Sequence, residues 1–260
     1  MKRIVIMGAT SGIGLRVAEI FARAGWMVGM AGRKENVMRN LQSDYPDRIR
    51  YARIDIDEPD APTRLRDLIS RLGGMDIYFH VSGICYENET LSPEREIATT
   101  QTNVVGFTRM IDAAFRYFRS RGIKGRIAAI TSVAGTKGIG GLPSYSASKA
   151  YQQTYLTALD QLAHIQDLGI SFTDIRPGWI RTPLLKADQI YPMTMDIDYA
   201  VVRIIRAIIR RKRVCVVDWR WNLLVGAWRV LPNRIWERIP FRTSTAVEQL
   251  CRKSSEKDIK

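Results

Sequence analysis

Residues 3–14 read Arg3-Ile4-Val5-Ile6-Met7-Gly8-Ala9-Thr10-Ser11-Gly12-Ile13-Gly14, and this stretch decides the fold. The apolar run indicates a buried strand, and the glycines that follow permit a tight turn into a helix. Backbone that turns closely at a helix N-terminus can approach a pyrophosphate, because the helix amides stabilise its negative charge. Many strand–helix turns use glycine, so the motif alone is weak evidence, but its place after a first strand favours a dinucleotide cradle.

The pattern continues outward from this turn, since short apolar runs alternate with helix-like segments over the first 180 residues. The expected strands are 3–7, 27–31, 49–55, 77–81, 125–131 and 171–176, with a seventh at 213–218. The expected helices include 12–24, 61–72, 94–121 and 145–168. The sequence therefore predicts an α/β fold, a Rossmann-type doubly wound parallel sheet of about seven strands with helices on both faces.

Composition fits one domain over residues 1–260, with 46% hydrophobic residues for a core and 25% charged residues for a surface. The three cysteines, Cys85, Cys215 and Cys251, show neither the spacing of a metal site nor the density of a disulfide framework. We expect reduced thiols and no metal.

The first three residues resemble the start of a secretory signal, but the apolar run behind them ends at Met7. No stretch of about 18 apolar residues occurs, so we expect a cytoplasmic protein without a spanning helix. The net charge of +14 indicates attraction to phosphate-bearing partners, which are a nucleotide, a nucleic acid or an anionic membrane. No nucleic-acid recognition motif appears, and we expect no nucleic-acid partner.

The end of the second strand bears on the choice of nicotinamide cofactor. An acid there binds the ribose hydroxyls of NAD and repels a 2′-phosphate. This chain has Ala31-Gly32-Arg33-Lys34, with two cations and no acid. Arg33 could form paired hydrogen bonds to the phosphate, and Lys34 adds positive potential. The alternative is a solvated basic turn; we predict NADP(H).

A second motif, Tyr145-Ser146-Ala147-Ser148-Lys149, follows Ser132 by 13 residues and suggests acid–base chemistry. Tyrosine has a reference pKa of about 10, and lowering it by about three units needs roughly 4 kcal/mol. Lys149 lies one helical turn after Tyr145 and can supply part of that field. Ser132, at a strand end, could bond a substrate oxygen as charge develops there. Such a pair often arises by chance; its coincidence with Ser132 and the glycine turn favours catalysis.

These motifs, with Thr102-Asn103-Val104-Val105-Gly106 and Pro177-Gly178-Trp179-Ile180-Arg181-Thr182, resemble the classical short-chain dehydrogenase/reductase (SDR) family over about residues 3–185. The resemblance implies a catalytic tetrad of Asn103, Ser132, Tyr145 and Lys149. Asn103 would bend a helix and hold a water that relays protons to Lys149. The family commonly forms dimers or tetramers through the helices that hold Asn103 and Tyr145, so we expect a homodimer or homotetramer.

The turn, the basic pair and the resemblance together predict the cofactor-binding residues. In the resemblance Asp55 contacts the adenine ring, Thr182 bonds the nicotinamide carboxamide, and Ile180 lies against the nicotinamide ring. The full set is Gly8, Thr10, Ser11, Gly12, Ile13, Gly14, Arg33, Lys34, Asp55, Ile56, Ser82, Gly83, Tyr145, Lys149, Pro177, Gly178, Ile180 and Thr182.

Two positions depart from the family pattern. After the fourth strand the family usually has two asparagines and then Ala-Gly, whereas this chain has His80-Val81-Ser82-Gly83. His80 could carry protons, but we favour a packing or hydrogen-bonding role. Met7 stands where threonine is common and is expected to affect the packing of the turn only. His164, on a helix face, is interpreted as structural or exposed.

Two later segments concern the substrate. Residues 183–199 correspond to the family's substrate lid and contain an apolar, adaptable set including Leu184, Leu185 and Met193; the alternative is that they only cover the core. Residues 219–241 form a Trp- and Arg-rich extension with Leu224, Trp228, Leu231 and Ile235 at helical spacing and a break at Pro232. This composition suits peripheral membrane contact, or else a helical flap on the lid or another subunit.

The sequence therefore predicts an NADP(H)-dependent oxidoreductase that transfers hydride between nicotinamide and a hydrophobic or lipid-like carbonyl/alcohol substrate. The alternative hypothesis is a catalytically silent cofactor-sensing or scaffold protein on the same fold. The intact set of Asn103, Ser132, Tyr145 and Lys149 argues against that alternative.

Overall fold

A seven-stranded parallel sheet in the order β3-β2-β1-β4-β5-β6-β8 forms the centre of the computed structural model, which describes residues 2–185, 189–240 and 245–246. The strands are β1 (Arg3–Met7), β2 (Met27–Gly32), β3 (Ile49–Arg53), β4 (Ile77–His80), β5 (Arg126–Ile130), β6 (Ser171–Arg176) and β8 (Val214–Val216). The short β7 (Gln189–Ile190) and β9 (Thr245–Ala246) pair separately and antiparallel. The doubly wound fold predicted from the sequence is confirmed, and the order in which strands are added to the sheet reverses between β1 and β4, although all seven strands remain parallel.

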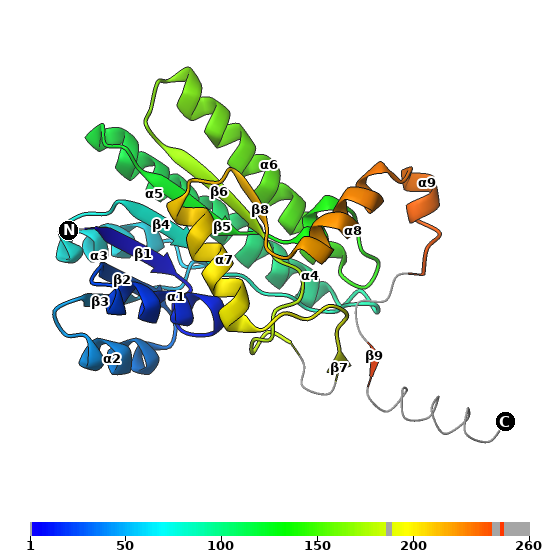
Figure 1. Ribbon diagram of the computed structural model, residues 1–260, viewed down its shortest axis with the longest axis horizontal. Helices are drawn as coiled ribbons and strands as arrows, with labels where there is room; N and C mark the ends of the chain where they lie inside the picture. Colours follow the sequence, from blue (N-terminus) through cyan, green and yellow to red (C-terminus); the bar gives the residue numbers. More distant parts are fainter. Residues whose placement is uncertain (1, 186–188, 241–244, 247–260) are drawn as a thin grey trace.

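Helices cover both faces of the sheet (Figure 1). On one face lie α1 (Gly12–Arg23), α2 (Glu35–Asp44) and α7 (Ile197–Ile209), and on the other α3 (Ala61–Leu72), α5 (Phe107–Arg121) and α6 (Pro143–Ile165). A hydrophobic core lies on each face of the sheet, and strand β1 contributes to both because successive side chains point to opposite faces. Ile4 and Ile6 pack in the core beneath α1 and α7, and Val5 and Met7 pack in the core beneath α3 and α5. All four are fully buried, which explains why the strand reads as an unbroken apolar run.

The single helix predicted over 94–121 is interrupted. It consists of α4 (Pro93–Thr100), a π-helical turn (Gln101–Gly106) and α5. Such a turn widens the helix locally and is common at functional sites. Asn103 lies in it, so the bend that the resemblance implied at this residue takes the form of a π-helical turn.

β2, β4 and β5 differ from their predicted ranges by one residue at one or both ends, whereas β3 and β8 each end two residues early because polar side chains turn the chain. β3 ends at Arg53 rather than residue 55, since the Asp55 carboxylate accepts a hydrogen bond from the backbone N–H of Asp57 at 3.2 Å and forms a local turn. β8 ends at Val216 rather than residue 218, because Asp218 caps the next helix by accepting from the backbone N–H of Arg220 at 2.8 Å.

Beyond β8 the chain forms α8 (Trp219–Val230) and the short α9 (Asn233–Trp236), with the predicted break at Pro232 (Figure 1). α8 contacts the 3-10 turn Val133–Thr136 that follows β5. Phe241 of the predicted extension, residues 186–188 of the predicted lid, and Cys251 lie outside the described residues. Within the described ranges, no helix combines the length and apolar character needed to span a bilayer.

Candidate active site

The glycine turn after β1 passes very close to the end of β4. Gly8 has φ of +93°, and a Cβ there would lie 2.6 Å from the backbone nitrogen of Ser82. A Cβ on Gly14 would overlap the carbonyl oxygen of Gly8. α1 then begins after Ser11, and within the described chain no side chain caps its first turn. Its N-terminal amides are therefore available to a negatively charged group, as a pyrophosphate cradle requires.

A cleft of about 370 Å³ lies over this turn at the carboxyl ends of the strands. The predicted residues in its lining are Gly8, Thr10, Ser11, Ile13, Arg33, Lys34, Asp55, Ile56, Ser82, Gly83 and Thr182. Its lining also includes residues that were not predicted, among them Gly32, Asp57 and Thr102. Gly12 and Gly14 do not line the cleft: a Cβ on Gly12 would sit 3.3 Å from the Thr182 side chain, and Gly14 packs against Gly8. Ligands of doubly wound folds bind in such crevices, and the cradle fits a dinucleotide.

Arg33 and Lys34 are exposed at the rim of the cleft. Neither forms an ion pair with any residue that the structure describes, so both charges remain available to a ligand. The acid nearest in sequence, Glu35, is engaged by Arg39 at 2.9 Å. The rim therefore presents net positive charge where an adenosine ribose would lie.

A smaller inner cavity of about 110 Å³ adjoins the cleft, since Val81, Gly83, Ile84, Thr182 and Leu184 line both. The predicted residues that line it are Gly83, Ser132, Tyr145, Lys149, Pro177, Gly178, Ile180 and Thr182. The structure thus brings the predicted proton-transfer residues and the predicted nicotinamide side of the cofactor site into one continuous space.

Tyr145 and Lys149 face this cavity from α6. Ser132 lines the same cavity, and the Lys149 Nζ lies 5.6 Å from the centre of the tyrosine ring. Burial raises the pKa of Tyr145 above its ordinary value, and the neighbouring Ser132 hydroxyl only partly offsets this. Burial lowers the pKa of Lys149 to about 8. At neutral pH the protein alone therefore holds a neutral phenol beside an ammonium, whereas sequence reasoning expected the lysine to lower the tyrosine pKa.

Asn103 lies behind the cavity and lines neither space. Its side chain is fully buried and clamps the segment after β4: Oδ1 accepts from the N–H of Ile84 at 2.9 Å, and Nδ2 donates to the Ile84 carbonyl at 2.8 Å. Nδ2 also donates to Ser148 Oγ at 3.2 Å. Asn103 therefore positions Ile84, which lines both spaces, and joins the π-helical turn to α6.

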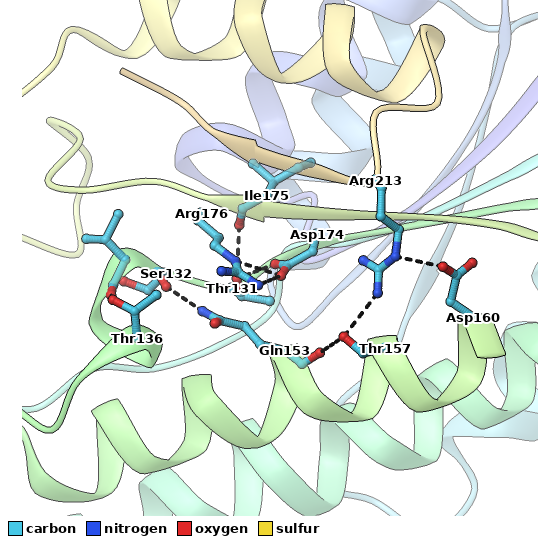
Figure 2. Close-up of polar contacts among 11 residues, drawn as sticks. Thr131, Ser132, Thr136, Gln153, Thr157, Asp160, Asp174, Ile175, Arg176 and Arg213 are labelled. Carbon is cyan, nitrogen blue, oxygen red and sulfur yellow. Dashed lines mark hydrogen bonds and ion pairs between the residues drawn. The ribbon is translucent and has the colours of Figure 1, made fainter. Parts of the chain in front are cut away.

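Two supporting polar groups behind Ser132 were missed by sequence reasoning (Figure 2). Gln153 donates to the Ser132 carbonyl at 2.7 Å, and Thr131 donates to the buried Asp174 carboxylate at 2.5 Å. Arg176 pairs with the same carboxylate at 2.6 Å. The available signal was a carboxylate in the middle of a predicted strand, since Asp174 lies between Phe172 and Ile175 in the buried part of β6.

His80 takes the packing role favoured from the sequence. It is fully buried, and its Nδ1 lies 3.0 Å from the Tyr78 hydroxyl. Burial, with a smaller contribution from the charge of Lys149, lowers the pKa of His80 to about 3. The imidazole is therefore neutral at physiological pH and unsuited to carrying protons. His164 is exposed on α6.

The tryptophans of α8 and α9 attach this segment to the rim of the inner cavity. Trp221 donates to the Met193 carbonyl at 3.4 Å, Trp228 to Thr136 Oγ1 at 2.8 Å, and Trp236 to the Gly138 carbonyl at 2.6 Å. Trp221 and Trp228 line the cavity itself. This packing matches the flap hypothesis for one face of α8.

The family model described as short chain dehydrogenase matches residues 2–190. The chain belongs to the short-chain dehydrogenase family. It is 30% identical to an uncharacterised oxidoreductase of Mycobacterium tuberculosis over 247 residues, which cover 91% of this chain and 96% of the relative. An actinorhodin polyketide ketoreductase solved with NADPH is 25% identical, with a TM-score of 0.62. The match covers 70% of this chain and 72% of the ketoreductase.

A 3-ketoacyl-(acyl-carrier-protein) reductase from Brucella melitensis, solved with NADH, has the same fold at 21% identity, with a TM-score of 0.73 and coverage of 84% and 96%. This chain is accordingly an SDR-type oxidoreductase with a nicotinamide cofactor site. Because the two solved neighbours hold different nicotinamide cofactors, the choice between them rests on this chain's own residues.

Proposed function

We propose that this short-chain dehydrogenase uses NADP(H) to reduce an apolar carbonyl compound to the alcohol. The observation that carries the proposal is the convergence of Ser132, Tyr145 and Lys149 on one cavity that opens into the glycine-turn cleft. Reduction requires an acid that gives its proton to the substrate oxygen. The neutral, buried phenol of Tyr145 is such an acid at neutral pH, which favours the reductive direction.

The preference for the 2′-phosphate is supported by Arg33 and Lys34. Both stand at the rim of the cleft, neither is paired among the described residues, and no acid takes the position that would bind ribose hydroxyls. A guanidinium and an ammonium attract a phosphate dianion, whereas they gain little from a ribose hydroxyl.

The remaining residues act around the cofactor, which when bound supplies the hydride to the carbonyl carbon. Ser132 holds the carbonyl oxygen by a hydrogen bond while negative charge develops on it. Tyr145 donates its proton to that oxygen, and the ammonium of Lys149 stabilises the phenolate that remains. Asn103 keeps Ile84 and the π-helical turn in place behind these groups.

The substrate class is inferred from the wall of the inner cavity. Most of the residues that line it are apolar, among them Ile139, Leu142, Trp179, Leu185 and Trp228. We assign residues 183–199 as the lid, because Leu184 and Leu185 line the cavity and Tyr191 packs on Trp179 with ring centres 4.8 Å apart. Apolar walls stabilise a hydrocarbon chain and leave sugar hydroxyls without partners.

The test is Tyr145→Phe with NADPH and a panel of aliphatic and isoprenoid ketones and aldehydes. We expect kcat to fall about a hundred- to ten-thousand-fold, the range of a lost general acid, while the Kd for NADPH changes less than about threefold. Tyr151→Phe is the matched control, since this tyrosine is partly exposed on the same helix and bonds Thr108. Retained turnover in Tyr145→Phe contradicts the assignment. NADPH binding without turnover in the wild type favours the silent scaffold.

A second proposal concerns the outer face of α8. Trp219, Leu223 and Val230 recur on one side of this helix with exposed fractions of 66%, 64% and 80%, opposite the buried Trp221, Val225 and Trp228. Arg229 lies beside this face on α8, and Arg234 lies on the following α9; both are exposed, and neither has an ion-pair partner among the described residues. An exposed tryptophan face with flanking arginines suits an anionic membrane surface, and we propose peripheral contact there.

A further inference from the structure

Gln152 lies on α6 three residues after Lys149 and is fully buried. Its Nε2 donates to the carbonyl of Asn103 at 2.8 Å, and its Oε1 accepts from Lys149 Nζ at 3.0 Å. Both partners fix the orientation of the amide, because an ammonium can only donate and a carbonyl can only accept. If the amide were flipped, its NH2 group would face the ammonium of Lys149 and its oxygen would face the carbonyl oxygen of Asn103, and neither pair can form a hydrogen bond. The side chain therefore bridges the ammonium of Lys149 to the π-helical turn.

This bridge determines how the ammonium is used. Lys149 has three N–H groups, of which one points to the carbonyl of Ile130 at 3.1 Å and a second to Gln152. One N–H remains, and Lys149 lines the inner cavity. The two protein acceptors thus hold the ammonium so that its third hydrogen is available to groups in that cavity, where Tyr145 also lies.

We propose that Gln152 is a positioning residue for Lys149, which fixes the direction of its ammonium and raises the stability of its charged form. The catalytic consequence of this role rests on the proposed function. A carboxamide is a poor proton carrier, because passing a proton would require its less stable imidic acid form. The bridge therefore holds the ammonium rather than relays protons.

The surroundings of Lys149 make this role measurable. From the segment after β4, burial raises the pKa of the Cys85 thiol to about 12, and on β4 the pKa of His80 is lowered to about 3. Asp174 on β6 is paired with Arg176, and burial raises the pKa of Tyr145 on α6. Cys85, His80 and Tyr145 therefore keep their protonation states between about pH 6 and 9. Burial lowers the pKa of Lys149 into that range, so a change in its hydrogen-bond acceptors can be measured there as a further shift of this pKa.

The experiment compares wild type with Gln152→Met and Gln152→Glu, using protein labelled with 13C at the lysine side chains. Lysine Cε signals are followed against pH, and the signal of Lys149 is the one absent from Lys149→Met. Methionine keeps the length of glutamine, but its thioether sulfur accepts only weakly from the ammonium, so the pKa of Lys149 is expected to fall by about one unit. Glutamate adds a charged acceptor and is expected to raise it by about one unit or more.

Thr154→Glu is the control, because it adds the same charge at an exposed position on α6 and should shift the pKa by less than about 0.3. With an active substrate, the basic limb of kcat/KM should move in the same two directions. Equal Lys149 pKa values in wild type and both Gln152 variants, or equal shifts in Gln152→Glu and Thr154→Glu, would overturn the proposal. The titration needs no substrate, so failure of the proposed function would leave this result standing.

Discussion

At the scale of single residues, Arg33 provides the sharpest test of cofactor choice. Its guanidinium is exposed at the cleft rim and unpaired within the described chain. A charged hydrogen bond to phosphate contributes about 1.5–3 kcal/mol, so Arg33→Ala is expected to weaken NADPH binding about ten- to a hundred-fold. Binding of NADH, which lacks the phosphate, should change less than about threefold. Titration of both cofactors by calorimetry measures the two effects.

The control for that prediction is Arg206→Ala, which removes an exposed cation from α7. Loss of general positive potential would weaken NADPH binding in both variants alike, and more at low salt than at high salt. A local contact weakens it only in Arg33→Ala. Similar losses for NADPH and NADH in Arg33→Ala would instead mean that Arg33 supports the fold of the turn.

Residues differ in how visible their roles are in the sequence. Ser132, Tyr145 and Lys149 were predictable because Tyr145 and Lys149 lie one helical turn apart and Ser132 closely follows the preceding strand. The role of Gln152 was not predictable, because it depends on a π-helical turn that brings the carbonyl of Asn103, 49 residues away, to the same helix. Its only signal was polarity at a position one turn from Lys149 on a buried helix face.

At the scale of elements, the loop after β6 and helix α8 depend on each other through Gly178. A Cβ at this position would overlap the indole ring of Trp221. Gly178→Ala is therefore expected to destabilise the protein by about 1–3 kcal/mol, the usual cost of overpacking. Because Trp221 and Gly178 both line the inner cavity, KM for the carbonyl substrate should rise more than kcat falls.

Gly226→Ala supplies the matched control on α8 itself. Gly226 is exposed, and a Cβ there would meet no atom within 4 Å. Alanine in a helix is favoured over glycine by roughly 0.5–1 kcal/mol, so this variant should be slightly more stable and unchanged in KM. Urea unfolding and steady-state kinetics of both variants decide the matter. A stable Gly178→Ala protein with wild-type KM would contradict the packing argument.

Strands and helices were predictable from periodicity, but α8 shows a limit of that method. The sequence grouped Leu224, Trp228, Leu231 and Ile235 as one apolar stripe, and of these only Trp228 is buried. Leu224 is half-buried and packs against the same core as Trp228. Leu231 caps the end of α8, and Ile235 lies beyond Pro232, where the chain leaves the helix, and is exposed. Within α8 the exposed apolar face lies opposite the buried apolar face, so the helix has no single apolar side that periodicity could detect. Only tertiary packing decides which face turns inward.

At the scale of the whole molecule, net charge and the outer face of α8 act together. The chain carries +14, and such a charge attracts anionic lipid headgroups over about one screening length. Charge alone gives weak, nonspecific attraction; the exposed Trp219, Leu223 and Val230 could add burial of apolar area at the lipid surface. The two contributions respond to different changes, since salt weakens the first and polar substitution the second.

We therefore expect the protein to co-sediment with vesicles of phosphatidylcholine and phosphatidylglycerol, but not with phosphatidylcholine alone. Binding should largely disappear at about 1 M salt, where the screening length is about 3 Å. Leu223→Asp combined with Val230→Asp should reduce it at low salt. Ile165→Asp, at an equally exposed apolar side chain on α6, should reduce it much less. If the α6 and α8 variants lose vesicle binding equally, net charge alone causes the binding and the outer face of α8 does not contribute. If the wild-type protein does not bind the anionic vesicles at low salt, the proposal of membrane contact is wrong.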